Sequence, residues 1–444
     1  MKNIIILLFL LCACGENINE NDFFIEKELS IRTSNNYIAV IEQAVRELNA
    51  EWDEGHLIVE FDIYDRFEFF EDYNDMLAAR DARRTRLIVE LMSGTASDLI
   101  LNDEFLPLEF AQSGHLADFY KLIDNCPVTT RDDFFMNILQ AGEFKGGLYF
   151  MPMDFGFLYV GISKHAPFID KFQSYSYITI SDLMNMYLES DSNMYSGIPS
   201  FFNAFNFNIS NFIDFNTRTA NINNNNILAE NIILTNRFKQ VTYEPMPPRF
   251  EFPVFWAQTR REQAENQMFL LLQEDLNVAD AFFDRDIHFN NFIPLADDFG
   301  NLILSNDMFG VNIMIPVQGD NDLTWKLTRY IIAAFAEPVG ESRVVGGWGT
   351  PAPWDGNNFN IPIIKNLVDA RMKRVIDNLQ GGGFRLADES YIDKIYKYAN
   401  MPISPSRFLF ESFLSPLDDF ELGLITVEQA LQHIQNSVSL WLIE

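Results

Sequence analysis

Histidine, cysteine and acidic residues are not spaced as in a metal site in this chain of 444 residues. A helical zinc site needs two histidines four residues apart, and no such pair and no cysteine cluster occurs. The acids Asp62, Asp65, Asp320 and Asp322 lack the twelve-residue ligand spacing of a calcium loop. We therefore expect no metal and no cofactor. The five histidines are His56, His115, His165, His288 and His433.

Two common catalytic motifs are also missing from the sequence. No Gly-x-Ser-x-Gly elbow occurs, and Gly381-Gly382-Gly383 lacks the Lys and Ser/Thr of a phosphate loop. The 63 acidic residues would allow a glycosidase pair, but the sequence does not set the distance between two carboxylates. We expect a protein that is not an enzyme, with a secreted glycan-active hydrolase as the alternative.

Polar and aromatic residues stand where three predicted strands end and in a glycine- and proline-rich loop at 346–354. Such side chains suit a sugar, because its hydroxyls form hydrogen bonds and its C–H faces stack on flat rings. The alternative for each aromatic is packing in the core, and for each acid a capping or solvated position. The candidate ligand contacts are Tyr64, Asp65, Asn102, Asp103, Asp154, Phe155, Trp348 and Trp354.

Apolar periodicity predicts the elements that hold these residues in place. Strands are expected at 29–33, 57–64 and 98–101, separated by helices at 37–52 and 73–92. This alternation is typical of a parallel α/β sheet, in which ligands bind beyond the carboxyl ends of the strands. Later segments are less regular, above all the Phe- and Asn-rich region 195–255. The further expected elements are strands at 148–151 and 157–162, a helix at 323–336 and a terminal helix that Thr426 and Gln429 cap.

The N-terminus has the features of an export signal. Lys2 precedes an apolar run at 4–11, which is too short to span a membrane as a helix. The following Leu11-Cys12-Ala13-Cys14-Gly15 is similar to a bacterial lipobox, in which Cys14 would be lipidated; Cys12 departs from its usual small residue. A plain secretory signal is the alternative. We expect a signal peptide at 1–14 and a flexible tether at 15–27.

Charge and cysteine content narrow the possible partners. The formal net charge of -31 would repel nucleic acid, so none is expected as a partner, and the charge favours solubility. We expect contact with the membrane only through the lipid anchor. Apart from Cys12 and Cys14, the chain contains only Cys126, which cannot form an intrachain disulfide alone. We expect Cys126 to be a packed small hydrophobic residue.

Several stretches of the chain resemble one family, the bacterial extracellular solute-binding proteins that include maltose-binding protein and many sugar-binding lipoproteins. The segment 91–100 is similar to a helix end, turn and buried strand of that family, although Ser97 stands where Pro is common. Region 195–255 matches least. The stretches that carry the resemblance are 91–100, 113–119, 146–152 and 423–436, in that order behind the lipobox.

The resemblance implies an α/β, two-lobe periplasmic-binding-protein fold, each lobe a mainly parallel sheet flanked by helices, with a hinge between lobes. The expected N-terminal lobe comprises 28–150 plus about 299–345, and the C-terminal lobe 151–298 plus about 346–444. It implies a monomer on the outer face of the cytoplasmic membrane that captures a mono- or oligosaccharide and delivers it to ABC permease subunits. A sugar-sensing or adhesion lipoprotein without a transport role is the alternative.

Overall fold

A computed structural model of the chain describes most residues from Ile25 to Ile443. The described residues are 25–53, 55–64, 73–102, 105, 110–111, 114–162, 169–189, 195–196, 204–214, 217–242, 269–273, 292–304, 311–336, 361–371, 373, 390–404 and 411–443.

The first sheet has the strand order β2-β1-β3-β13-β4. β1 (Ile25–Ser34) pairs in parallel with β2 (Gly55–Tyr64) and with β3 (Leu99–Asn102). β13 (Asn312–Met314) is antiparallel to both β3 and β4 (Met151–Pro152). The three predicted N-terminal strands are confirmed. β1 begins at Ile25, so residues 25–27, which were expected to belong to the tether, are part of this sheet.

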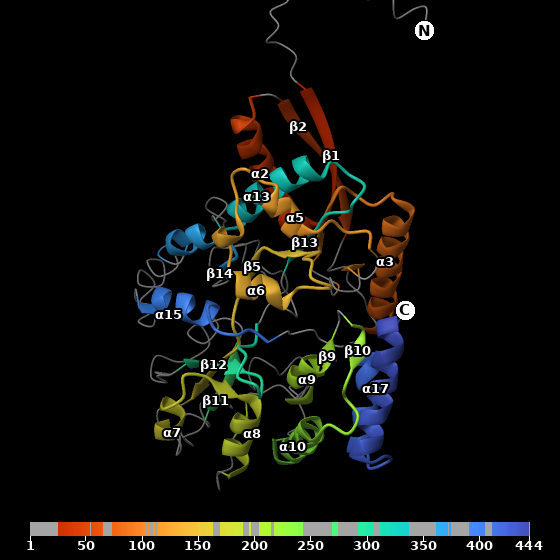
Figure 1. Ribbon diagram of the computed structural model, residues 1–444, viewed down its shortest axis with the longest axis vertical. Helices are drawn as coiled ribbons and strands as arrows, with labels where there is room; N and C mark the ends of the chain where they lie inside the picture. Colours follow the sequence, from red (N-terminus) through yellow and green to blue (C-terminus); the bar gives the residue numbers. More distant parts are fainter. Residues whose placement is uncertain are drawn as a thin grey trace, which may run out of the picture.

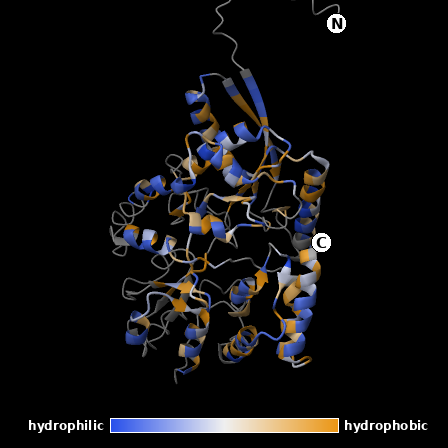
Figure 2. Ribbon diagram, viewed as in Figure 1, coloured by the Kyte–Doolittle hydropathy of each residue, from blue (hydrophilic) through white to orange (hydrophobic). Residues whose placement is uncertain are grey.

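Helices flank this sheet. α2 (Ile38–Glu51) buries Val40, Ile41, Ala44 and Leu48, the side chains that its apolar period predicts. It packs against α13 (Asn321–Ala336), and Figure 1 shows these two helices away from α3 (Tyr73–Ser93). In Figure 2 the helices alternate hydrophobic and hydrophilic residues along their length, as amphipathic helices do.

The second sheet has the order β7-β12-β6-β11-β8. Its strands are β7 (Ile178–Thr179), β12 (Phe292–Ala296), β6 (Tyr159–Ile162), β11 (Phe269–Gln273) and β8 (Tyr195–Ser196). β6 is antiparallel to both neighbours, whereas β7 and β8 run parallel to theirs. Each sheet therefore has one reversed strand among its described strands, and the mainly parallel arrangement is confirmed.

Two chain segments cross between the sheets side by side. The first leads from β4 through β5 (Asp154–Phe155) to β6, and the second leads from β12 back to β13. They meet where Phe157 bridges Leu304 and the amide of Leu158 donates to Ile303 O at 3.0 Å. The segment 401–404 runs beside Leu302. In each sheet, the strand that directly follows a crossing runs against the others: β6 after the first crossing and β13 after the second.

Separate hydrophobic clusters lie around the two sheets. The largest surrounds the first sheet and also includes Ile361 of β14 (Ile361–Pro362) and Ile395 of α15 (Ser390–Ala399). A second cluster joins β6, β7 and β12 to α8 (Ile180–Glu189). Figure 1 shows the first sheet in the upper half of the molecule and the second sheet in the lower half.

The C-terminal helices close a third cluster. α17 (Val427–Ile443) packs against α16 (Glu411–Glu421) and α10 (Asn226–Thr242), and the Trp441 ring meets Phe413 at 5.9 Å. The predicted cap is confirmed: the Thr426 amide donates to Gln429 Oε1 at 2.8 Å and the Gln429 amide to Thr426 Oγ1 at 3.3 Å. The remaining elements are η1 (Asn35–Tyr37), α5 (Phe119–Asp124), η2 (Arg131–Asp133), α6 (Met136–Ala141), α7 (Ile169–Gln173), α9 (Ala204–Asn208), η3 (Ile209–Phe212), β9 (Ile213–Asp214) and β10 (Thr219–Ala220).

Candidate functional site

The carboxyl ends of β2 and β3 bring two of the predicted site residues together. Tyr64 is the last residue of β2 and Asn102 the last of β3, and β1 lies between these strands. The Tyr64 hydroxyl donates to Leu101 O at 3.0 Å, so the phenol spans the end of β1. Parallel pairing places these ends at one edge, where α/β sheets bind ligands.

A recess of about 200 Å³ opens beside these residues, including the solvent at its mouth. Only about 10 Å³ of it is space that can be compared with ligand sites of about 300–1,000 Å³, so it has room for about one water-sized group and would hold at most a small part of a ligand. Its lining is mainly apolar, with Tyr64, Asn102 and Arg32 as the polar members. The lining residues are Arg32, Tyr64, Leu87, Ile100, Leu101, Asn102 and Phe105.

Asn102 shapes the turn that follows β3. Its Nδ2 donates to Phe105 O at 2.6 Å, and its Oδ1 accepts from the Phe105 amide at 3.1 Å. The side chain is buried, so these bonds satisfy polar atoms that water cannot reach. Asn102 thereby holds Phe105 at the recess.

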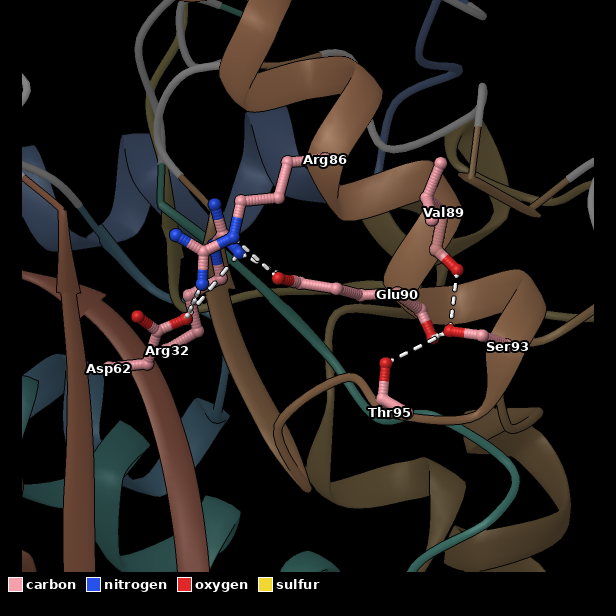
Figure 3. A network of polar contacts seen from close by, with 7 residues as sticks. All are labelled: Arg32, Asp62, Arg86, Val89, Glu90, Ser93 and Thr95. Carbon is pink, nitrogen blue, oxygen red and sulfur yellow. Dashed lines mark hydrogen bonds and ion pairs between the residues drawn. The ribbon is translucent and has the colours of Figure 1, made fainter.

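An ion-pair network supports the recess, and the sequence analysis missed it. Arg32 on β1 has a side chain only 5% exposed, and its Nη1 lies 2.7 Å from Glu90 Oε2 on α3 and 3.5 Å from Asp62 Oδ2 on β2. Arg86 binds the same two acids, with Nε 2.5 Å from Glu90 Oε1. Figure 3 shows both guanidinium groups pointing to Glu90 and Asp62. Hydrogen bonding and charge from Glu90 raise the pKa of Arg86, and Asp62 adds to this effect.

The end of α3 is tied down next to this network. Ser93 Oγ donates to Val89 O at 2.8 Å and lies 2.9 Å from Thr95 Oγ1, as Figure 3 also shows. Gly94 follows with φ +73°, and a Cβ there would collide with the Gln318 side chain. The left-handed turn therefore requires glycine.

The network leaves the recess without an excess of charge. Two guanidinium groups face two carboxylates, and the Arg32 guanidinium carbon lies 5.9 Å from the centre of the Tyr64 ring. A buried arginine with paired charge offers no free cation to an acidic ligand. The arrangement therefore suits a neutral, polar ligand with an apolar face. The strand pattern gives no signal for this network, because Arg32 stands on the same face as the polar Ser30, opposite Leu29 and Ile31.

Asp154 and Phe155 lie on β5, where the chain crosses between the sheets. Both are buried, and β5 pairs with β14. The Phe155 ring meets Phe135 at 5.2 Å and Phe157 at 5.6 Å, as expected of a ring that packs in a core. No contact between this pair and Tyr64 is described. Four other predicted contacts, Asp65, Asp103, Trp348 and Trp354, lie outside the described residues, as does Cys14.

The second lobe contains a partly buried network of acids and amides. The Asp298 carboxylate accepts from Ser181 Oγ at 2.7 Å, Asn208 Nδ2 at 2.9 Å and Asn231 Nδ2 at 2.7 Å. The neighbouring Asp297 is fully buried and accepts from Asn211 Nδ2 at 2.9 Å and Asn301 Nδ2 at 3.0 Å.

This network explains part of the Phe- and Asn-rich region. Asn208 and Asn211 hold the turn after β12, while Phe205 and Phe207 enter two of the hydrophobic clusters. The asparagines therefore have structural partners in the described residues.

Among the residues that the structure describes, no three His, Cys, Asp or Glu side chains come together as metal ligands. Nor does any helix in these ranges have the length and apolarity to cross a membrane.

Comparisons with known proteins identify the fold. No family model and no curated protein matches the sequence. Among solved structures, the sugar-binding protein MalE from Xanthomonas citri is similar, with a TM-score of 0.58 and 13% identity over 94% of this chain and 98% of that one. The ABC substrate-binding protein Lmo0181 from Listeria monocytogenes, in complex with cycloalternan, has a TM-score of 0.52 and 14% identity over 93% and 98%.

A third structure shows the same extent of similarity. The ABC transporter solute-binding protein from Thermotoga lettingae TMO, bound with alpha-D-tagatose, has a TM-score of 0.50 and 13% identity, covering 94% of this chain and all of that one. These neighbours are binding proteins by name. The periplasmic-binding-protein fold expected from the sequence resemblance is therefore confirmed over nearly the whole chain.

Proposed function

We propose that this chain is an extracellular, lipid-anchored solute-binding protein that captures a carbohydrate between its two lobes for an ABC-type permease. The observation that carries the proposal is the charge-balanced recess at the ends of β2 and β3, which Tyr64 and Asn102 both line in a solute-binding fold. A sugar offers hydroxyls and a weakly apolar face, which match such a lining. The sugars named with the structural neighbours support this ligand class.

The remaining site residues complete the proposal. Asp65 and Asp103 directly follow Tyr64 and Asn102 in the sequence, so they would extend the polar edge of the recess. Asp154 and Phe155 would contribute from the crossing, and Trp348 and Trp354 would stack on the ligand. A monomer with lobes at 28–150 plus about 299–345 and 151–298 plus about 346–444 is part of the proposal. Because Ile361 and Ile395 join the core of the first sheet, part of the last range packs on the first lobe.

Cys14 would anchor the protein on the outer face of the cytoplasmic membrane. Stable anchoring needs more than one acyl chain or a second membrane signal. Cys14→Ser should release the protein from the membrane fraction of its native host, whereas Cys12→Ser should leave it there. Equal release of both variants, or of neither, would count against Cys14 as the anchor.

A thermal-shift panel tests the ligand class. The probes are alpha-D-tagatose, cycloalternan and linear malto-oligosaccharides, with a dipeptide and a free amino acid as controls. A ligand at about 100 times its dissociation constant stabilises the folded state by about 2.7 kcal/mol, which raises the melting temperature of a chain of 444 residues by roughly 3 °C. A shift with the dipeptide or amino acid and none with any saccharide would contradict the carbohydrate assignment.

Chromatography of each saccharide after incubation separates binding from hydrolysis. We expect every saccharide to stay intact, whereas a glycan-active hydrolase would give products. A permease gene beside the coding sequence would favour transport over a sensing or adhesion role.

Tyr64→Ala tests the position of the site. Loss of a central aromatic contact costs about 2 kcal/mol, roughly 30-fold in dissociation constant. Tyr330→Ala is the matched control, because the Tyr330 hydroxyl binds Glu51 on the α2 side of the first lobe. Equal affinities for the two variants would show that the recess is not part of the site.

A further inference from the structure

A turn in the second lobe carries an exposed aromatic side chain, Phe299. The turn follows β12 and leads directly into the second crossing. Phe299 is 47% exposed, more than any other aromatic residue whose side chain the structure describes. A single exposed ring is common on protein surfaces, so the place of this ring and the way it is held decide what it indicates.

The strand directions place this turn opposite the edge of the first sheet that carries Tyr64 and Asn102. β4 runs parallel to β3, because both strands are antiparallel to β13. The first crossing therefore leaves the first sheet at the edge where β3 ends. It leads into β6, which is antiparallel to β12, so the second sheet faces the crossing with the end of β12.

The carboxyl ends of β3 and β12 thus face each other across the crossing segments. Figure 1 shows the first sheet above these segments and the second sheet below them. Ligands of α/β sheets bind beyond the carboxyl ends of the strands. Phe299 stands three residues after the last residue of β12, which is the corresponding place in the second lobe.

Buried hydrogen bonds fix the backbone that carries the ring. The fully buried Asp297 carboxylate accepts from the Phe299 amide at 3.0 Å and from the Asn301 amide at 2.9 Å. The Gly300 amide donates to Asp297 O at 3.0 Å, and Gly300 has φ +83°. A Cβ at Gly300 would lie 2.7 Å from the Tyr177 hydroxyl oxygen, so this position requires glycine.

The ring itself is supported on one side. Its centre lies 5.6 Å from that of Phe212, and the two planes meet at 67° in an edge-to-face contact. Such a contact covers at most one of the two faces of a ring. Phe212 belongs to η3, and Asn211 of the same element donates to Asp297 at 2.9 Å, so the supporting ring is tied to the same turn.

We propose that Phe299 is the stacking residue that the second lobe contributes to the ligand site. Its open face binds the C–H face of a saccharide ring, which matches a flat apolar surface held in a fixed position. Tyr64 and Asn102 contact the same ligand from the first lobe. This inference rests on the proposed function, because it needs a saccharide bound between the lobes.

Calorimetry with the saccharides of the thermal-shift panel tests the contact. We expect Phe299→Leu and Phe299→Ala to raise the dissociation constant at least about tenfold, because both variants lack a flat ring. Phe299→Tyr keeps the ring and should stay within about threefold of the wild type. All three should melt near the wild-type temperature, because the side chain is half exposed.

Ile233→Ala is the matched control, because Ile233 on α10 is in the same lobe and 45% exposed. It should keep the wild-type affinity. If no saccharide binds the wild type, the proposed function fails and this inference with it. If a saccharide binds the wild type and Phe299→Leu equally well, or if Ile233→Ala weakens binding as much as Phe299→Leu does, only the inference about Phe299 is overturned.

Hydroxyl-radical oxidation of the wild-type protein gives a second test that needs no variant. Trypsin releases residues 286–326, and fragment spectra resolve Phe299 within this peptide. We expect a saturating amount of the bound saccharide to slow oxidation of Phe299 and to leave the exposed Met92 on α3 unchanged. Unchanged oxidation of Phe299 with a saccharide that calorimetry shows to bind would overturn the inference.

Discussion

Glu90→Gln is the most informative perturbation of the network beside the recess. The substitution keeps the shape of Glu90 but removes the carboxylate 2.7 Å from Arg32. Removing one partner of a fully buried ion pair costs about 3–5 kcal/mol. Asp62 remains 3.5 Å from Arg32, and the Glu90 side chain is 19% exposed, so we expect a smaller cost of about 2 kcal/mol.

Urea unfolding measures this cost. With a slope of about 4 kcal/mol per molar urea for a chain of 444 residues, the midpoint should fall by roughly 0.5 M. Arg86→Gln is the matched control, because Arg86 binds the same acids from a side chain that is 61% exposed, and exposed pairs contribute about 0–1 kcal/mol. In a chain that already carries Arg32→Met, Glu90→Gln should lower the free energy of unfolding much less than it does in the wild type. If Glu90→Gln costs no more than Arg86→Gln, our account of the buried network is wrong.

Three other perturbations give distinct outcomes. Asp298→Ala removes the shared acceptor of several buried donors and should destabilise the protein by about 2–4 kcal/mol in urea unfolding; a loss near zero would contradict this. The pKa of Asp320 is lowered by the Leu323 amide and by Lys27, so its stabilisation is present at neutral pH and lost in acid. The melting temperature of Asp320→Asn should thus approach the wild-type value below about pH 4; an unchanged difference would contradict the assignment. Trp348→Ala or Trp354→Ala should weaken saccharide binding at least about tenfold in calorimetry with near-normal melting, whereas two normal affinities would place the site elsewhere.

The N-terminal half of the first lobe could be predicted because its pattern is local. Alternating apolar residues and helical periods specify β1, α2, β2, α3 and β3 one after another, and the Thr426 cap has its partner three residues away. The insertion of β13 between β3 and β4 depends on residues far apart in the chain, so no local period reveals it.

The sequence predicts at which strand ends the candidate site lies, but not the hydrogen bonds and ion pairs around it. The topology rule for parallel strands identifies Tyr64 and Asn102, but the bonds from Asn102 to Phe105 depend on the turn geometry. The Arg32 network joins three elements, and the Asp298 network joins residues up to 117 positions apart. A single sequence contains no signal that pairs such distant partners.

Small-angle scattering tests the central claim most directly, namely that a carbohydrate binds between the two lobes. The protein is measured alone and with a saturating amount of the saccharide that raises its melting temperature. Binding proteins of two hinged lobes close around their ligands. We predict a smaller radius of gyration with the saccharide, and an unchanged radius in the presence of the dipeptide control. Calorimetry first verifies that the saccharide binds. An unchanged or larger radius of gyration with that saccharide would then contradict capture between the lobes.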